Sequence, residues 1–592
     1  MLSVGRPPAM HRSLLALPLA AGIILTAPLA VGSAATHGRP AAGLSFAVTA
    51  TADAHDAQPG DARCTASTGQ CTLRAAVEEA AAQPRGTAVS ITLPAGTYPL
   101  AQGSLDFDGG PVSVAGAGAR SVVIEATGRF RVLEVGSAAT VTLSGVTITG
   151  GQPRAGRYGG GVLNTGHLQV IDSIVTANRA TAGGGIANAG GTVMLSHSSV
   201  TGNDAPLYGG GGIQNGGFRN VAGTVEVIAS TVVGNVSGGD GGGILNGQNG
   251  HPGQAGHPGQ AGTFAAPVRS ACLEIPRCAC FARFGAAASA APEPLAPPGL
   301  RLIVTGSRIE GNAGTNSGAG IANDGGTAVI TGSTLSGNTA GQSPGGAIAN
   351  YGPLTLVHDT LTHNRAAYGG ALEAAYAGTP GRQVVLDSTL TGNKALTGGA
   401  IDDGTDTLYV TASTLAGNSA TLGGAIEVEG ASFFYLLNST LTGNSAKSGT
   451  GGAIDTYGCG GGVVSYSTIA GNSSGLNLPC SDLVVTGSII AASAPGPNCA
   501  GAAPHESAGY NLDTGVSCAF AKPTDLTAAS PLLGPLAANG GPTPTRAPAD
   551  GSPAIDHGGT RATGCPAADQ RGVSRPQGPA CDIGAVEVQP AG

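Results

Sequence analysis

Four acidic residues recur at one position of a repeated motif and are the side chains best suited to chemistry. The position directly after a Leu or Ile is acidic in four successive repeats, at Glu373, Asp402, Glu427 and Asp455, with steps of 25 to 29 residues. If the repeats stack as strands in register, the carboxylates form a column with a spacing of about 4.8 Å. Like charges at that distance repel, which favours proton sharing or the binding of a cation. We call these four residues the acidic column.

Three interpretations of the acidic column are open. It is a solvated face, whose charge Arg365, Lys394 and Lys447 on nearby turns partly offset. Alternatively, its carboxylates bind Ca²⁺ or contact a ligand. Finally, it holds the catalytic pair of a polysaccharide-active hydrolase or lyase, because retaining hydrolysis places two carboxyls about 5 Å apart. The chain has no Trp and few Tyr to stack on sugars, and it lacks the common nucleotide-binding, zinc-protease and serine-hydrolase motifs, which weakens the enzyme interpretation.

The repeats that position these carboxylates are marked by an Asn, usually within a Gly-Asn motif. Most steps between markers are 25 to 29 residues, and the marker asparagines are Asn178, Asn203, Asn235, Asn312, Asn338, Asn364, Asn393, Asn418, Asn444 and Asn472. An aliphatic residue stands three and eight positions before every marker. The residue ten positions before is usually apolar, although Gln383 and Gly462 are exceptions. Positions ten and eight alternate as in a strand with one buried face, and position three begins a second strand facing the same interior.

Each repeat continues into a Gly-Gly-x-Ile type segment, as at Gly399-Ala400-Ile401. The Ile supplies a third wall of the interior, while the glycines permit tight corners. Three short strands per repeat at a fixed period predict an all-β fold, a right-handed parallel β-helix that forms a solenoid of about 12 coils. Val141 and Leu483 begin the first and last of these coils, which lack the marker Asn.

The marker asparagines have a structural explanation. Stacked carboxamides can hydrogen-bond from one coil to the next, and Asn tolerates the left-handed backbone conformation of a turn. A row of asparagines that binds a ligand is the alternative. Since turn chemistry alone accounts for the pattern, we expect a ladder that supports the scaffold.

The exposed strand edges at the two ends of such a rod need covers. Residues 71–80 place Leu73, Ala76, Val77 and Ala80 on one helical face, so we predict a short capping helix there. The segment 89–93 has the alternation of a strand and is expected to enter the first coil. The C-terminal region, which is rich in loops, is expected to cover the other end.

The composition limits the partners. Of 592 residues, 102 are Gly and only 10% are charged, and the formal net charge is −8 with scattered basic residues, which argues against a nucleic-acid surface. Arg6 and Arg12 precede the apolar run 14–31 and the small residues 32–35, a pattern typical of a signal peptide at 1–35. We therefore expect a secreted or cell-surface protein without a membrane span in the mature chain. A membrane anchor at this run is the alternative.

Oxidised cysteines fit that compartment. Neighbours in the sequence suggest four disulfides: Cys64 with Cys71, Cys459 with Cys480, Cys499 with Cys518, and Cys565 with Cys581. The remaining Cys272, Cys278 and Cys280 provide too few ligands for a zinc site, so at most one bridge and a free thiol are expected there.

Motifs near both ends resemble known families. Asp61, Cys64 and the segment 71–77 resemble the N-terminal motif of secreted bacterial β-helix proteins named for a Cys-Ser-Leu-Arg-Glu-Ala signature, with Thr72 and Ala75 in place of Ser and Glu. The segments 509–512, 531–536, 539–543, 551–556, 569–572 and 581–585 resemble the choice-of-anchor Q domain. The Gly-Gly-Ala-Ile segments are similar to polymorphic outer-membrane protein repeats. The resemblance implies a surface or secreted protein with a C-terminal anchor, but no sorting motif, apolar tail or basic end follows Val588, so the route of attachment stays open.

These features predict four regions. They are a signal peptide (1–35), an N-terminal cap with a short helix (36–110), a parallel β-helix (111–500) interrupted by a Gly/Pro/Ala-rich insertion (247–300), and a choice-of-anchor Q-like region (501–592). The insertion contains two His-Pro-Gly-Gln-Ala-Gly copies and is either a flexible excursion or a partner-binding loop. The chain is expected to act as an adhesin-like scaffold that binds a cell-surface or extracellular glycan or protein, without a cofactor unless Ca²⁺ occupies the acidic column. A polysaccharide-active enzyme is the alternative.

Overall fold

The computed structural model describes residues 43–216, 221–247, 299–374, 382–404, 407–430, 432–457, 460–479, 482–491, 496–501 and 506–589. The predicted signal peptide, all of the insertion except its first and last residues, and Cys272, Cys278, Cys280, Cys459 and Cys480 lie outside these residues. Among the residues that the structure describes, no helix is long and apolar enough to cross a membrane.

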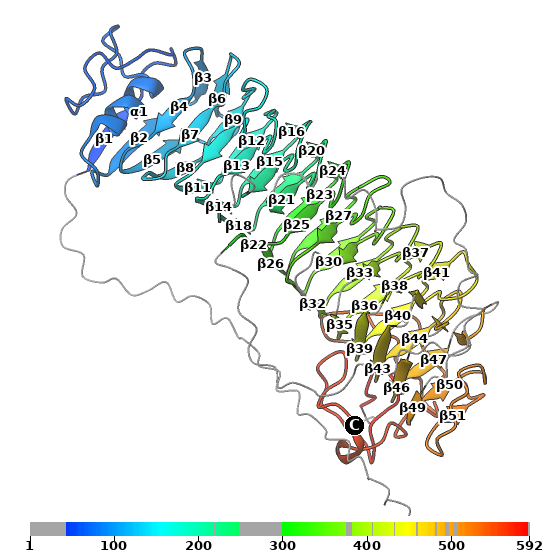
Figure 1. Ribbon diagram of the computed structural model, residues 1–592. Helices are drawn as coiled ribbons and strands as arrows, with labels where there is room; N and C mark the ends of the chain where they lie inside the picture. Colours follow the sequence, from blue (N-terminus) through cyan, green and yellow to red (C-terminus); the bar gives the residue numbers. More distant parts are fainter. Residues whose placement is uncertain are drawn as a thin grey trace, which may run out of the picture.

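The described chain is a parallel β-helix of about 13 turns, drawn as a long rod in Figure 1. Each coil contributes one strand to each of three sheets that run along the rod, and neighbouring strands pair in parallel, as β11 (His167–Ile171) does with β14 (Thr192–Ser196). The predicted fold class is confirmed. The Gly-Asn spacing predicts about 12 coils, slightly fewer than observed, because the first turns of the rod, which contain β2 to β7, lack this motif.

The strands have the following bounds. Sheet 1 contains β1 (Leu44–Ala47), β2 (Val89–Leu93), β5 (Pro111–Gly116), β8 (Thr140–Ser144), β11, β14, β18 (Thr224–Ile228), β22 (Arg301–Thr305), β26 (Thr327–Thr331), β29 (Leu354–Val357), β32 (Arg382–Leu386), β35 (Thr407–Thr411), β39 (Phe433–Leu437), β43 (Gly461–Ser465), β46 (Asp482–Thr486) and β49 (Glu506–Gly509). Sheet 2 contains β3 (Gly96–Leu100), β6 (Val122–Ala126), β9 (Thr147–Thr149), β12 (Ile174–Thr176), β15 (Ser199–Thr201), β19 (Thr231–Val233), β23 (Arg308–Glu310), β27 (Thr334–Ser336), β30 (Thr360–Thr362), β33 (Thr389–Thr391), β36 (Thr414–Ala416), β40 (Thr440–Thr442), β44 (Thr468–Ala470), β47 (Ile489–Ala491), β50 (Leu512–Asp513) and β51 (Leu526–Thr527).

Sheet 3 contains β4 (Leu105–Phe107), β7 (Leu133–Val135), β10 (Val162–Asn164), β13 (Ile186–Asn188), β17 (Ile213–Asn215), β21 (Ile244–Gly247), β25 (Ile321–Asp324), β28 (Ile348–Asn350), β31 (Leu372–Ala374), β34 (Ile401–Asp403), β38 (Ile426–Glu429), β42 (Ile454–Tyr457), β45 (Leu476–Asn477) and β48 (Cys499–Ala500). Short strands at the corners are β16 (Asp204–Ala205), β20 (Val236–Ser237), β24 (Ala313–Gly314), β37 (Ser419–Ala420) and β41 (Ser445–Ala446).

The aliphatic positions of the repeat form one continuous core along the rod. Residues ten, eight and three before each marker, and the Ile of the third strand, are buried, as Leu408, Val410, Leu415 and Ile426 illustrate. The core also explains the Gly462 exception. A Cβ at Gly462 would lie 2.4 Å from the ring of Phe434, whose bulk fills that space from the neighbouring coil.

Two asparagine ladders support the corners. Each marker asparagine before Asn472 donates from Nδ2 to Oδ1 of the next marker, as Asn338 does to Asn364 at 3.0 Å, so the expected ladder is confirmed. The left-handed backbone, however, belongs to the residue before the marker, such as Gly392 at φ +65°, and this part of the prediction is wrong. A second, unpredicted ladder joins Asn164, Asn188, Asn215, Asn246, Asn323 and Asn350 on sheet 3. Gln383 ends it by accepting from Asn350 at 2.7 Å, which explains the other exception.

The two sides of the insertion belong to one regular stack. Strand β18 pairs with β22, and β21 pairs with β25, so the chain leaves and re-enters the rod without a change of register. The ladder bond from Asn235 to Asn312 also continues across the interruption, at 3.1 Å. The strand pairing and the marker ladder are therefore continuous across the interruption.

The predicted helix closes the N-terminal end. Helix α1 (Leu73–Ala82) buries Leu73, Ala76, Val77 and Ala80 in the core of the rod. The side chain of Thr72 caps it by accepting from the Ala75 amide at 3.1 Å, so the replacement of Ser by Thr keeps the cap. Strand β1 pairs with β2 and covers the edge of sheet 1.

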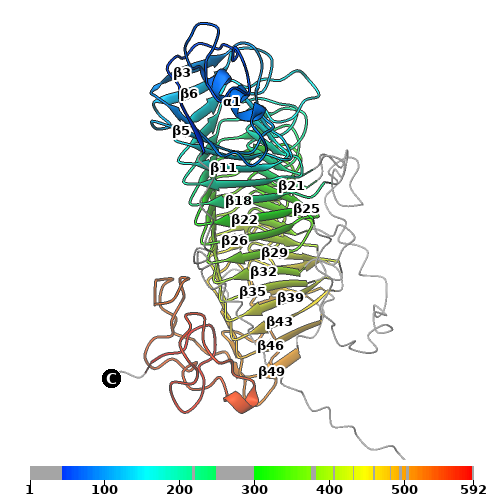
Figure 2. The ribbon, with the colours of Figure 1, turned by 90° about the vertical axis from the view of Figure 1, so that its left-hand side faces the viewer.

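The C-terminal region does more than close the rod. Cys518, which is bonded to Cys499, and Phe520 join the core at the last coil. Residues 530–589, which we call the C-terminal lobe, then turn back along the side of the rod, as the orange and red segment in Figure 2 shows. Three of the predicted disulfides are confirmed, at Cys64–Cys71, Cys499–Cys518 and Cys565–Cys581, whereas both cysteines of the fourth lie outside the described residues.

Candidate functional site

The structure brings the acidic column together on four successive strands of sheet 3. The strand register aligns Glu373 on β31 with Asp402 on β34, then with Glu427 on β38 and Asp455 on β42. Asn477 follows in the next coil and donates to Asp455 at 2.7 Å. The predicted stacking of these four residues is therefore observed.

The column is buried, however, and the predicted solvated face is wrong. The exposed fractions of its four residues are only 0 to 4%. The cause is the glycine-rich turn before each strand, which folds back over the outward-facing side chain. A Cβ at Gly423, where φ is +57°, would lie 2.7 Å from the Glu427 carboxylate, and a Cβ at Gly451 would lie 2.7 Å from that of Asp455.

Burial dominates the electrostatics of the column. It raises the pKa of Glu373, Asp402 and Glu427 well above the ordinary values, because the charged forms lose their hydration, and neighbouring carboxylates add to the shift. Thr397 donates to Oδ2 of Asp402, while Asp402 Oδ1 and Glu427 Oε2 have no hydrogen-bond partner among the described residues. These carboxyls are therefore placed to hold protons.

The arrangement does not offer an open catalytic pair. A polysaccharide cannot reach carboxyls that the glycine turns cover, so the geometry gives no support to the hydrolase or lyase interpretation. Within the described residues, no three His, Cys, Asp or Glu side chains come together in a way that could hold a metal ion. Calcium binding by the column stays a prediction.

A different surface, on the outer face of sheet 2, is open to solvent. The residues on either side of the inward aliphatic side chain are Thr or Ser in most coils and form two parallel columns, which we call the threonine columns. In three consecutive coils they consist of Thr334 and Ser336, Thr360 and Thr362, and Thr389 and Thr391, all half-buried by their neighbours. The spacing is about 4.8 Å between coils and about 6.6 Å along a strand.

The first of the two columns has free hydroxyl groups. The hydroxyls of Thr334, Thr360 and Thr389 make no hydrogen bond to any residue that the structure describes, whereas Thr391 donates to Ala416 O at 2.9 Å. One coil earlier, Arg308 and Glu310 occupy the two columns and pair with each other. The open array is thus polar, regular and almost without net charge.

The same columns bind the C-terminal lobe further along the rod. Thr414 donates to the Pro544 carbonyl at 2.5 Å, Thr440 donates to Gln570 Oε1 at 2.6 Å, and Thr468 accepts from the Ala585 amide at 3.0 Å. These three threonines are 0 to 1% exposed. A threonine column therefore takes neutral donors and acceptors in this protein.

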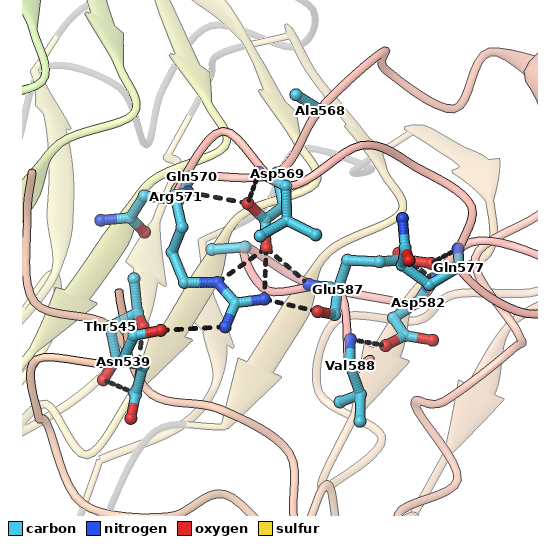
Figure 3. Close-up of polar contacts among 12 residues, drawn as sticks. Asn539, Thr545, Ala568, Asp569, Gln570, Arg571, Gln577, Asp582, Glu587 and Val588 are labelled. Atoms are coloured by element: carbon cyan, nitrogen blue, oxygen red, sulfur yellow. Dashed lines mark hydrogen bonds and ion pairs between the residues drawn. The ribbon is translucent and has the colours of Figure 1, made fainter. Parts of the chain in front are cut away.

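Ion pairs hold the lobe in shape, as Figure 3 shows around Asp569, Arg571 and Glu587. Arg571 pairs with Asp569 at 2.8 Å, and the buried Arg575 pairs with Glu587 at 3.4 Å. Burial raises the pKa of Asp582 to about 6. Each of these charges has a partner within the lobe, so the segment 569–588 has a structural role here and holds the lobe together.

Sequence reasoning missed the threonine columns although their signal is legible. Thr or Ser stands four and two positions before many markers, as in the Thr-Leu-Thr segments at 360–362 and 389–391. Because the aliphatic residue between them points inward, both hydroxyls had to point outward.

Fold and surface together define a parallel β-helix protein. No family model matches the chain, and no curated protein matches it. Among solved structures, the chain is similar to the crystal structure of the pectate lyase Pel9A, with 12% sequence identity, a TM-score of 0.29, and coverage of 92% of this chain and 97% of that chain. A likeness at this TM-score carries no argument about activity.

Proposed function

We propose that this protein is an exported, adhesin-like rod that binds a neutral polysaccharide along the open threonine columns of sheet 2. The observation that carries the proposal is the uncovered array of hydroxyls on Thr334, Thr360 and Thr389, which repeats at the spacing of the coils.

The chemistry of the array supports a neutral polyhydroxy ligand. A threonine hydroxyl both donates and accepts, and sugar hydroxyls require partners of both kinds. The lobe already uses Thr414, Thr440 and Thr468 in this way for uncharged groups. Arg308 is paired with Glu310, and Arg365 and Lys394 lie on the following corner rather than in the columns, so the open hydroxyls themselves present no cation to an acidic polymer. Many weak contacts along a rigid rod add up through multivalency.

Export and family membership belong to the same proposal. The signal-peptide pattern, three disulfides and the lack of a membrane-spanning helix among the described residues are compatible with an extracellular location. The resemblances to the Cys-Ser-Leu-Arg-Glu-Ala motif, the choice-of-anchor Q domain and polymorphic outer-membrane repeats support a surface protein.

Binding to insoluble and soluble neutral glycans tests the proposal. Chain 36–592 is incubated with cellulose, chitin, dextran and a galactan, and with polygalacturonate as the acidic control. The double variant Thr360→Val and Thr389→Val removes two hydroxyls while it keeps the shape and the strand preference, so we expect binding to fall about tenfold. Thr355→Val on the outer face of sheet 1 is the matched control and should bind as the parent does.

Three outcomes would contradict the proposal. They are the absence of binding to every neutral glycan, equal binding by the double variant, or equal loss in the Thr355→Val control. New reducing ends or unsaturated products in the same incubations would instead favour the polysaccharide-active alternative.

A further inference from the structure

The outer face of sheet 1 carries an apolar row that the core does not need. At the middle position of successive strands from β22 to β46, the outward residues are Ile303, Val329, Thr355, Val384, Tyr409, Tyr435, Val463 and Val484. We call this row the apolar stripe. The core lies on the opposite face of each strand and is filled by other residues, such as Val385 and Val410, which are 0 to 1% exposed. Seven of the eight stripe residues are apolar or aromatic, a composition that solvent contact alone does not explain.

The centre of the stripe is aromatic and already packed. The rings of Tyr409 and Tyr435 stack in parallel, with centroids 4.7 Å apart and planes 3° from parallel. The guanidinium of Arg382 lies 4.4 Å from the Tyr409 centroid, on this same face of the sheet. Phe433 lies 5.1 Å from Tyr435 in a tilted arrangement. Because Arg382 and the neighbouring ring occupy these ring faces, the stripe is a poor platform for stacking sugars and a better one for a flat apolar surface.

The described part of the chain leaves this face open. The C-terminal lobe contacts sheet 2 and the turn between sheets 1 and 2, where Thr543 donates to Ala412 O at 3.0 Å. Figure 2 shows the strands of sheet 1 as one row along the rod, with the lobe beside it. The side chains of Val357, Leu386 and Leu437 lie at the edge of the same face and widen its apolar part.

We propose that a second copy of this chain docks on the apolar stripe, so that two rods lie face to face through sheet 1. The eight stripe residues themselves carry no charge, and Arg382 beside them lies over the Tyr409 ring, so the stripe offers mainly an apolar surface that can pair with its own copy. Eight strands span about 34 Å, and a five-residue strand spans about 16 Å, which gives about 540 Å² per copy and about 1,100 Å² in all. That area is at the low end for specific complexes and fits a dimer with a dissociation constant in the micromolar range.

Two-fold symmetry fixes which residues meet. The middle of the stripe lies between β32 and β35, so an axis there places Val384 of one copy over Tyr409 of the other. A charge introduced at 384 is therefore present twice near the axis, and the two like charges repel in a surface that excludes water. Lys and Glu at this position should each prevent self-association, and a mixture of the two variants should restore it.

Sedimentation velocity from about 1 to about 300 µM tests the pairing at concentrations that bracket a micromolar constant. We expect the parent chain 36–592 to form dimers as the concentration rises, and Val384→Lys and Val384→Glu each to weaken dimerisation at least about tenfold. An equimolar mixture of the two variants should form a heterodimer. Thr334→Lys, equally outward-facing but on sheet 2, is the matched control and should dimerise as the parent does.

Circular dichroism of each variant confirms that the rod is folded, so a loss of association is not mistaken for unfolding. A parent chain that stays monomeric over the whole range overturns the inference. So does dimerisation that Val384→Lys leaves unchanged, or that Thr334→Lys weakens equally. The variants designed to weaken glycan binding lie on sheet 2, whereas those designed to prevent dimerisation lie on sheet 1. The dimer and the proposed function can therefore be refuted independently of each other.

Discussion

Removal of one carboxamide from the middle of the marker ladder is the most direct perturbation of the scaffold. In Asn338→Ala, four buried hydrogen bonds are lost. Oδ1 of Asn338 accepts from the amide and the Nδ2 of Asn312, both at 3.0 Å, and its Nδ2 donates to Ile309 O at 2.9 Å and to Asn364 Oδ1 at 3.0 Å. All four lie in the interior, since Asn338 is 0% exposed.

The loss of unfolding free energy depends on which of the four bonding groups keep another hydrogen-bond partner in the variant. Asn312 Nδ2 still donates to Val232 O, and Asn364 Oδ1 still accepts from the backbone amide of residue 338. The Asn312 amide has no other partner among the described residues, and an orphaned buried N–H costs about 1–3 kcal/mol. With about 1 kcal/mol for each of two further net losses, Asn338→Ala should lower the free energy of unfolding by about 3–5 kcal/mol.

Guanidinium denaturation followed by circular dichroism measures the total effect, and hydrogen exchange locates it. We expect the amide of Asn312 to exchange much faster, because only Oδ1 of Asn338 protects it. Asn316→Ala, at an exposed Asn on a neighbouring turn, is the control and should change stability by less than about 0.5 kcal/mol. A cost below about 1 kcal/mol for Asn338→Ala, or unchanged exchange at Asn312, would refute the ladder as a major support.

Three further predictions concern the acidic column and the corners. Burial raises the pKa of Glu427. The stability that its bound proton provides is therefore complete below the pKa of the unfolded chain, near 4.5, and is lost as the pH rises through the higher pKa of the folded protein. In melting curves recorded at increasing pH, Glu427→Gln should lose less stability than the parent. If calcium occupies the acidic column, millimolar Ca²⁺ should raise the melting temperature and a chelator should lower it. An unchanged melting temperature would argue against calcium and for bound protons as what neutralises the carboxylates. Ala177 has φ +53° where most coils have Gly, so Ala177→Gly should stabilise the rod by about 0.5–1 kcal/mol in denaturant titrations, and a loss of stability would contradict this.

The parts of the fold that depend on the nearest coil were predictable. The interior wall needs an aliphatic side chain at a fixed offset in every coil, because each coil packs only on its neighbours, and residues such as Leu335 and Val410 therefore repeat the same pattern. The exceptions were not predictable in this way. Gln383 accepts a hydrogen bond from the side-chain amide of Asn350, and Gly462 leaves space for the ring of Phe434. Each exception is therefore explained by one particular residue in the neighbouring coil.

The acidic column shows where strand alternation stops being informative. Alternation correctly turned Asp402 and Glu427 away from the core, but outward means exposed only if nothing covers that side. Gly398 and Gly423 take left-handed backbone conformations, at φ +58° and +57°, and their turns pass over the carboxylates. The glycines were visible in the sequence, yet the direction in which their turns fold depends on backbone angles that the sequence pattern does not specify.

The threonine columns make the same point for function, because identical sequence has opposite exposure along one face. Thr389-Leu390-Thr391 lies open, while Thr440-Leu441-Thr442 lies under the C-terminal lobe. What differs is the second column, where Ala416 and Ala470 flank Thr442 and are 8% and 2% exposed. Two small residues let the lobe approach the sheet closely, whereas Ser336, Thr362 and Thr391 keep the open part hydroxylated. The lobe thus sets which part of the threonine columns is covered and which part stays open. The two alanines are the mark of this long-range contact in the repeat, and their meaning depends on where the lobe folds.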